Sequence, residues 1–243
     1  MTQCKKVVII PAYNEGRNII NVVNDMKSFR PDFDIVVIDD GSTDDTQKVA
    51  EDCHIPVISL PFNLGIGGAM QTGFKYAKEN GYDIAIQVDG DGQHMPQEIP
   101  KLLKYLQNDQ NDVVIGSRYL EDNDYKTPLF RKLGILLFSF VNSQIAKKRF
   151  TDNTSGFRAY NSKAIHFLAL NYPSDYPEVE AVAVLAMNRF RIKEVPVLMR
   201  PRQFGVSSIN AISAIYYMIK VSLALLVNIS RRHENLGGSI NVL

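Results

Sequence analysis

The sequence predicts an α/β protein built on a mostly parallel sheet that carries helices on both faces. Short β-branched runs recur along residues 1–120, and segments with helical spacing of apolar residues lie between them. Each run is almost continuously apolar and is bounded by turn residues, which is typical of strands buried on both faces. At 243 residues the chain makes one large domain or two small ones.

Five strands and four helices are expected in alternation. The strands are expected at 6–10, 34–38, 56–60, 83–88 and 112–115. The helices are expected at 18–29, 43–53, 67–80 and 96–107. The second helix opens on Ser42 and Thr43, which are good N-caps, and the third closes on Asn80 and Gly81. The fourth helix starts with Pro96, as first turns often do.

Composition excludes several classes of protein. The 27 basic and 26 acidic residues leave a net charge of +1, so nothing in the overall charge favours nucleic acid as a partner. The two cysteines, Cys4 and Cys53, are too few for a disulfide framework and indicate a reducing compartment. The N-terminal stretch has only a short apolar run before a proline and an acid, so we expect no signal peptide.

Polar side chains follow four of the predicted strands. The segments are 11–15 (PAYNE), 39–44 (DDGSTD), 89–94 (DGDGQH) and 116–119 (GSRY). Ligands of open α/β sheets bind beyond the carboxyl ends of the strands. We therefore expect these four segments to converge on one functional edge of the sheet.

Asp89 and Asp91 flank Gly90 at the end of one predicted strand. Two carboxylates in this relation can reach one divalent cation, and the glycine keeps the backbone accessible to a phosphate. Hard oxygen ligands suit Mg²⁺ or Mn²⁺, and Gln93 can add a carbonyl oxygen. A plain acidic turn is the alternative for such a motif alone. The polar and charged residues that follow the other predicted strands favour a metal and phosphate site.

Six motifs together resemble family 2 glycosyltransferases, most closely the dolichyl-phosphate mannose synthase branch and its bacterial polyprenyl-phosphate relatives. They are PAYNE at 11–15, DDGSTDDT at 39–46, NLGIGGAMQTG at 63–73, VDGDGQH at 88–94, GSRY at 116–119 and TSGFRAYN at 154–161. The likeness runs from about residue 6 to about residue 208. It implies a GT-A fold with a Rossmann-like mixed sheet, a nucleotide-sugar donor, a divalent metal and inversion at the anomeric carbon.

The resemblance also implies roles for single residues. Contacts to the donor would come from Pro11, Tyr13, Glu15, Ile38, Asp40, Asp89, Gly90, Asp91, Gln93 and Arg202. The metal ligands would be Asp89, Asp91 and Gln93. Arg118 and Arg131 resemble the basic residues that hold the phosphate of a lipid acceptor. The sequence departs from the family pattern at Ser208, where such enzymes often carry a lysine.

The acceptor decides whether a catalytic base is needed. A polyprenyl phosphate is already anionic at pH 7, whereas a sugar hydroxyl needs a carboxylate to take its proton. The candidates for that base are Asp152, Glu178 and Glu180, although Glu178 and Glu180 also suit the first turn of a helix. Transfer to a sugar hydroxyl in polysaccharide or lipid-linked oligosaccharide assembly is thus the alternative function. A non-catalytic assembly subunit is a third hypothesis, which the intact metal motif disfavours.

His94 follows the metal motif and has two interpretations. It can touch phosphate or metal directly. The alternative, which we favour, is a surface or supporting histidine next to the site.

Two apolar stretches, 133–141 and 211–229, carry basic residues at their flanks. Lys220 lies at the centre of the second stretch, which therefore reads as an amphipathic helix at a membrane interface rather than a span. We expect a catalytic domain at 1–208, an interfacial helix at 209–232 and a flexible tail at 233–243. The expected partners are a cytoplasmic membrane surface or a small membrane protein, and a homodimer stays open.

Overall fold

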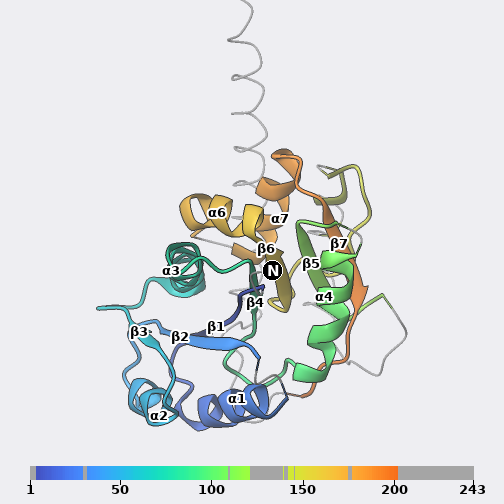
Figure 1. Cartoon of the computed structure of the whole chain (residues 1–243). Helices are drawn as coiled ribbons and strands as arrows, with labels where there is room; N and C mark the ends of the chain where they lie inside the picture. Colours follow the sequence, from blue (N-terminus) through green and yellow to red (C-terminus); the bar gives the residue numbers. More distant parts are fainter. Residues whose placement is uncertain are drawn as a thin grey trace, which may run out of the picture.

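The computed structural model describes residues 4–29, 32–108, 110–120, 139, 142–144, 146–174 and 177–201. Seven strands form one sheet in the order β3-β2-β1-β4-β6-β5-β7 (Figure 1). The strands are β1 (Lys6–Ala12), β2 (Asp34–Asp39), β3 (Val57–Ser59), β4 (Ile84–Gln87), β5 (Val113–Ser117), β6 (Arg158–Asn161) and β7 (Ile192–Pro196). The helices are α1 (Gly16–Phe29), α2 (Thr46–Asp52), α3 (Gly65–Glu79), the 3₁₀ turn η1 (Pro96–Glu98), α4 (Ile99–Gln107), α6 (Ser162–Asn171) and α7 (Pro177–Met187).

The sheet is mixed, with a parallel half and a reversed strand. β1 pairs in parallel with β2 and β4, and β2 pairs in parallel with β3. β6 runs antiparallel between β4 and β5, and β5 pairs in parallel with β7. The five strands expected from the sequence are therefore present, and the α/β class is confirmed. The strands β6 and β7 and the helix α6 are additions that the sequence pattern did not predict. The helix α7 has Glu178 and Glu180 in its first turn, as the alternative interpretation of these two residues expects.

Both faces of the sheet are buried, as the continuous apolar runs predict. Along β1, Val7 and Ile9 face α3, α6 and α7, whereas Val8 and Ile10 face α1 and α4 (Figure 1). All four side chains have no exposed surface. Each such burial contributes about 1.5–3 kcal/mol. The two apolar layers thus fix the sheet, and with it the positions of the strand ends.

The loops that follow β1 and β2 interlock. Asn14 accepts a hydrogen bond from the Thr43 amide at 2.9 Å and donates its own amide to the Ser42 hydroxyl at 2.9 Å. The Glu15 amide donates to the Thr46 hydroxyl at 2.8 Å. Because residues 42 and 43 are engaged in this way, α2 begins at Thr46 and not at Thr43 as the sequence suggested.

No helix among the described residues is long and apolar enough to cross a membrane. The stretch 211–229 lies outside the described residues, and so does 133–141 apart from Ser139. The predicted interfacial helix and the proposed domain boundaries at 208 and 232 lie outside them too.

Candidate active site

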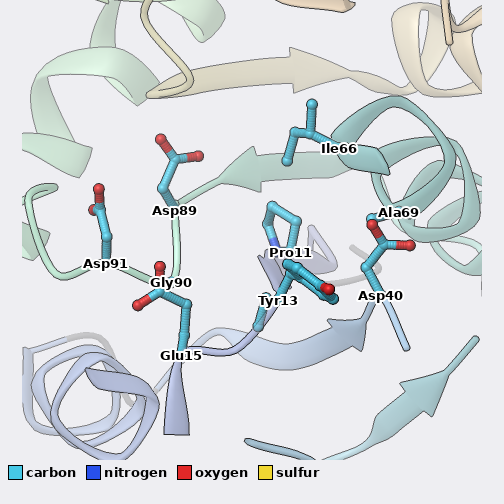
Figure 2. Close-up of a pocket in the computed structure, with 10 residues that line it drawn as sticks. Pro11, Tyr13, Glu15, Asp40, Ile66, Ala69, Asp89, Gly90 and Asp91 are labelled. Carbon is cyan, nitrogen blue, oxygen red and sulfur yellow. The ribbon is translucent and has the colours of Figure 1, made fainter. Parts of the chain in front are cut away.

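A pocket of about 290 Å³ opens at the carboxyl ends of β1, β2 and β4. Its lining is Pro11, Ala12, Tyr13, Glu15, Asp40, Ile66, Ala69, Asp89, Gly90 and Asp91 (Figure 2). Seven of these are residues that the resemblance assigned to the donor. The strand ends therefore converge as expected for a ligand site of an open α/β sheet.

Three expected donor residues are not part of this lining. Ile38 has no exposed surface and packs in the core layer with Ala69 and Met70. The Gln93 side chain donates from Nε2 to the Arg200 carbonyl at 3.3 Å. Arg202 lies outside the described residues, as does Arg131 on the acceptor side.

Asp40 shapes the wall of the pocket that α3 supplies. Its Oδ1 accepts the Leu64 amide at 2.8 Å, and the residue is only 3% exposed. Loss of hydration raises the pKa of Asp40, while the bond from the Leu64 amide acts in the opposite direction. This contact holds the start of α3, so Ile66 and Ala69 face the cavity. The glycine-rich segment after β3 was the sequence signal for this wall, but it did not identify these two residues.

The Asp89 and Asp91 carboxylates lie side by side at one end of the pocket (Figure 2). The Asp89 side chain is 37% exposed, and loss of hydration raises its pKa. Asp91 Oδ1 accepts the Gln93 amide at 3.1 Å, which holds the turn. A Cβ at Gly90 would lie 3.1 Å from the Pro11 carbonyl oxygen, so only a glycine leaves this close approach unstrained.

These two carboxylates fit a hard divalent cation. Within the described part of the chain, no group of three or more His, Cys, Asp or Glu side chains could hold a metal ion. Mg²⁺ typically takes one or two carboxylates and completes its shell with substrate phosphates and water. A pair of aspartates beside a cavity large enough for a ligand therefore suits a metal that arrives with a diphosphate.

Arg118 and Asp152 form a buried, bidentate ion pair next to this end of the pocket. Arg118 Nε lies 2.7 Å from Asp152 Oδ2, and Nη2 lies 2.7 Å from Oδ1. Asp152 also accepts the Arg118 amide and has no exposed surface. The charge of Arg118 acts on Asp89, where it lowers the pKa. Asp152 thus serves as the partner of an arginine, and its carboxylate is closed to an incoming hydroxyl.

Glu194 on β7 holds the loop that carries Asp152. Its carboxylate accepts the amides of Thr151 and Asp152, both at 2.8 Å, and the Thr151 hydroxyl at 3.0 Å. Burial raises the pKa of Glu194, and these bonds act against that rise. Glu194 could not be identified from the sequence, because its partners lie more than forty positions earlier in the chain.

Arg158 joins the same loop to the start of α7. Its guanidinium donates to the carbonyls of Asn153 at 2.9 Å, Ser155 at 2.7 Å and Glu178 at 2.9 Å, and the residue has no exposed surface. Burial raises the pKa of Glu178, Arg158 lowers it, and the neighbouring Asp89 raises it. Of the base candidates on α7, Glu178 thus senses the charge of Asp89. Glu180 is buried at 8% exposure.

His94 follows the turn 89–93 and is buried, with 6% of its surface exposed. Burial lowers its pKa to about 4, so the imidazole is neutral at pH 7. It is not part of the pocket lining. The supporting interpretation of His94 is therefore the one that the geometry favours.

Known proteins with similar sequences are sugar transferases. The sequence profile of "Glycosyl transferase family 2" matches residues 7–168. A UDP-N-acetylglucosamine–dolichyl-phosphate N-acetylglucosaminyltransferase of Methanococcus voltae is 35% identical over 210 residues, which are 78% of this chain and 83% of that protein. An undecaprenyl-phosphate mannosyltransferase of Micrococcus luteus is 31% identical over 213 residues, which are 84% of this chain and 87% of that protein.

Solved structures show the fold. Glucosyl-3-phosphoglycerate synthase from Mycobacterium tuberculosis, crystallised with Mn²⁺, UDP and glucosyl-3-phosphoglycerate, superposes with a TM-score of 0.70 at 18% identity. The match covers 93% of this chain and 80% of that one. The expected GT-A fold is thereby confirmed for the catalytic part of the chain.

Proposed function

The chain belongs to glycosyl transferase family 2 and is a glycosyltransferase, and we propose that it moves a hexose from a nucleotide sugar to a polyprenyl phosphate, undecaprenyl or dolichyl, with inversion at the anomeric carbon. The observation that carries the proposal is the pocket in which Asp40, Asp89 and Asp91 meet. It belongs to a chain whose relatives are named as transferases of sugars to dolichyl or undecaprenyl phosphate.

The residues divide between donor and acceptor. Pro11, Tyr13, Glu15 and Asp40 would hold the nucleoside, and Asp89, Gly90 and Asp91 would hold the diphosphate end through Mg²⁺ or Mn²⁺. The metal, when bound, supplies Lewis-acid stabilisation of the leaving diphosphate. We further propose that Gln93 is a third metal ligand. On the donor side, Ile38 would contact the base and Arg202 the diphosphate. On the acceptor side, Arg118 and Arg131 would hold the phosphate.

The buried state of Asp152 supports a lipid phosphate over a sugar hydroxyl as the acceptor. A hydroxyl would need a general base within hydrogen-bond reach. Asp152 already accepts bonds from Arg118 and Thr154 and has no exposed surface. An anionic phosphate needs no base, so this site serves it without Asp152. Glu178 is then the base candidate on which the hydroxyl alternative depends.

The test is transfer from radiolabelled UDP- and GDP-hexoses to undecaprenyl and dolichyl phosphate, followed by extraction of the lipid product. We expect labelled lipid that mild acid cleaves as a glycosyl phosphate, and no product after chelation of divalent cations. Asp91→Ala should lower transfer at least about 100-fold, because a metal contributes several kcal/mol to leaving-group stabilisation. Asp52→Asn, on the exposed side of α2, is the matched control and should leave transfer unchanged.

Two outcomes would contradict parts of this proposal. Unchanged transfer by Asp91→Ala removes the metal role. The hydroxyl alternative is established if the product is an acid-stable glycoside and Glu178→Gln abolishes its formation while donor binding is unchanged.

On the acceptor side, Arg131→Ala should raise the KM for polyprenyl phosphate while donor binding stays near normal.

A membrane location follows from the proposed acceptor, since a polyprenyl chain resides in the bilayer. The proposal is peripheral association with the cytoplasmic face through residues 209–232, directly or by way of a small membrane protein. The amphipathic pattern and the basic residues 231 and 232 support this placement.

A further inference from the structure

His94 contacts both the backbone and the side chain of Asp89. Its Nδ1 accepts the Asp89 amide at 3.0 Å, and its Nε2 lies 3.6 Å from Asp89 Oδ2. A nitrogen that accepts a hydrogen bond carries no proton in the neutral ring, so the ring proton is on Nε2. The imidazole therefore accepts a hydrogen bond from the Asp89 amide, and its Nε2–H lies in electrostatic contact with the carboxylate of the same residue, at a distance too long for a hydrogen bond.

The imidazole is itself held from two further directions. It stacks on the Phe157 ring with 4.8 Å between centroids and 16° between planes. Its backbone bridges to Met199, and the Gln93 carbonyl accepts the Arg200 amide at 2.9 Å. The stacking on Phe157 and the backbone contacts with Met199 and Arg200 thus hold the imidazole ring in place.

We propose that His94 is a positioning residue that holds the Asp89 carboxylate ready for the divalent cation. The inference deepens the proposed function and rests on it, because it takes Asp89 as a metal ligand. His94 holds the backbone of Asp89 by a hydrogen bond and lies against its carboxylate. Loss of the neighbours that orient a metal ligand typically weakens metal binding about 10–100-fold. His94 acts through Asp89 and does not line the pocket where the cation would bind.

The test measures Mn²⁺ binding by electron paramagnetic resonance in the full-length chain, with and without UDP or GDP. His94→Phe keeps an aromatic ring against Phe157 and removes both nitrogen contacts. We expect its Mn²⁺ dissociation constant in the presence of nucleotide to rise about tenfold or more. Transfer should recover in part at saturating Mn²⁺. His166→Phe is the matched control, because His166 is exposed on α6, and it should bind Mn²⁺ as the unmodified chain does.

The outcomes separate this inference from the proposed function. If Asp91→Ala loses Mn²⁺ and His94→Phe binds it within twofold of the unmodified chain, the positioning role is wrong and the metal site stands. If Asp91→Ala binds Mn²⁺ unchanged, the metal site is wrong and the role of His94 is wrong with it.

A second variant covers a failure of His94→Phe to fold, judged by circular dichroism. His94→Asn keeps an acceptor for the Asp89 amide and lacks the Nε2 donor. Its Mn²⁺ constant should lie between those of the unmodified chain and an Asp89→Asn variant. An unchanged constant for His94→Asn would contradict the proposed contact with the carboxylate.

Discussion

Gly156 lies against the Asp89 carboxylate at one end of the pocket. A Cβ at this position would lie 2.6 Å and 2.8 Å from the two carboxylate oxygens of Asp89. Real Cβ atoms do not approach oxygen so closely, so a side chain at this position must displace the Asp89 carboxylate. The bare backbone of Gly156 therefore leaves room for the carboxylate in the position that it takes here.

We predict that Gly156→Ala lowers kcat/KM for sugar transfer about 100-fold, because a misplacement of about 1 Å in a reacting group costs that much. Steady-state kinetics with labelled nucleotide sugar measure the loss. Lys48→Ala is the control, since Lys48 is exposed on α2 and does not line the pocket. Transfer by Gly156→Ala at the unmodified rate would show that the Asp89 carboxylate can move without cost.

Some residues of the candidate site could be identified from the sequence and others could not. Seven of the pocket residues were identifiable through the resemblance, because they belong to motifs at or just after the ends of strands. Ile38 was carried over with them, yet it lies inside the strand, where α3 covers it. His94 and Gly156 were visible in the sequence, but their purpose depends on contacts with Asp89 that only the folded chain creates.

At the scale of elements, one buried network ties three parts of the sheet together. Arg118 follows β5, Asp152 lies in the loop before β6, and Glu194 belongs to β7. The ion pair and the bonds to Glu194 are all at 3.1 Å or less. The network thus fixes the loop that carries Thr151 and Asp152 relative to β5 and β7.

We predict that Asp152→Asn destabilises the fold by about 3–5 kcal/mol, because it leaves the buried guanidinium of Arg118 without its counter-charge. Urea unfolding measures the change. Lys163→Gln is the control, since Lys163 is 60% exposed in its pair with Asp112 and should contribute less than about 1 kcal/mol. If Asp152→Asn keeps its stability and loses only transfer, Asp152 acts in the reaction and the hydroxyl alternative gains support.

The strands β1 to β5 and the helices α1 to α4 were predictable, whereas β6, β7 and α6 were not. The first five strands are continuous apolar runs, and their periodicity needs no tertiary information. β6 and β7 contain Arg158 and Glu194, which break the apolar pattern. Arg158 donates to backbone carbonyls of the loop before β6, and Glu194 accepts amides of the same loop, so the folded structure compensates a cost that the apolar pattern does not show.

Across the whole molecule the charges nearly cancel, but acidic and basic residues gather in different parts of the chain. Acidic residues collect at the strand ends around the pocket, where Asp40, Asp89 and Asp91 lie. Basic residues flank the two apolar stretches, as in the exposed run 147–149 and at residues 231 and 232. Such an arrangement suits an enzyme that binds a metal-bearing nucleotide at one place and an anionic membrane surface at another.

The sequence of 211–229 makes the membrane part of the proposal testable in the full chain. On a helix, Ile215, Ile219 and Leu223 share one stripe, and Lys220 and Asn228 share the other. Leu223→Asp should lower the fraction bound to anionic liposomes about tenfold or more, since burying one leucine contributes about 1.5–3 kcal/mol. Sedimentation of the protein with the liposomes measures the bound fraction.

Asn228→Asp adds the same charge to the polar stripe and is the matched control. It should reduce binding only by the loss of attraction to the anionic surface, about 1 kcal/mol, and the reduction should shrink at high salt. Because the pocket residues are distant in sequence from both substitutions, nucleotide binding should be unchanged in each variant. Equal sedimentation of the two variants would mean that the apolar stripe does not enter the membrane interface. Liposome binding would then depend on charge alone, and a protein partner would be the better explanation for the apolar stripe.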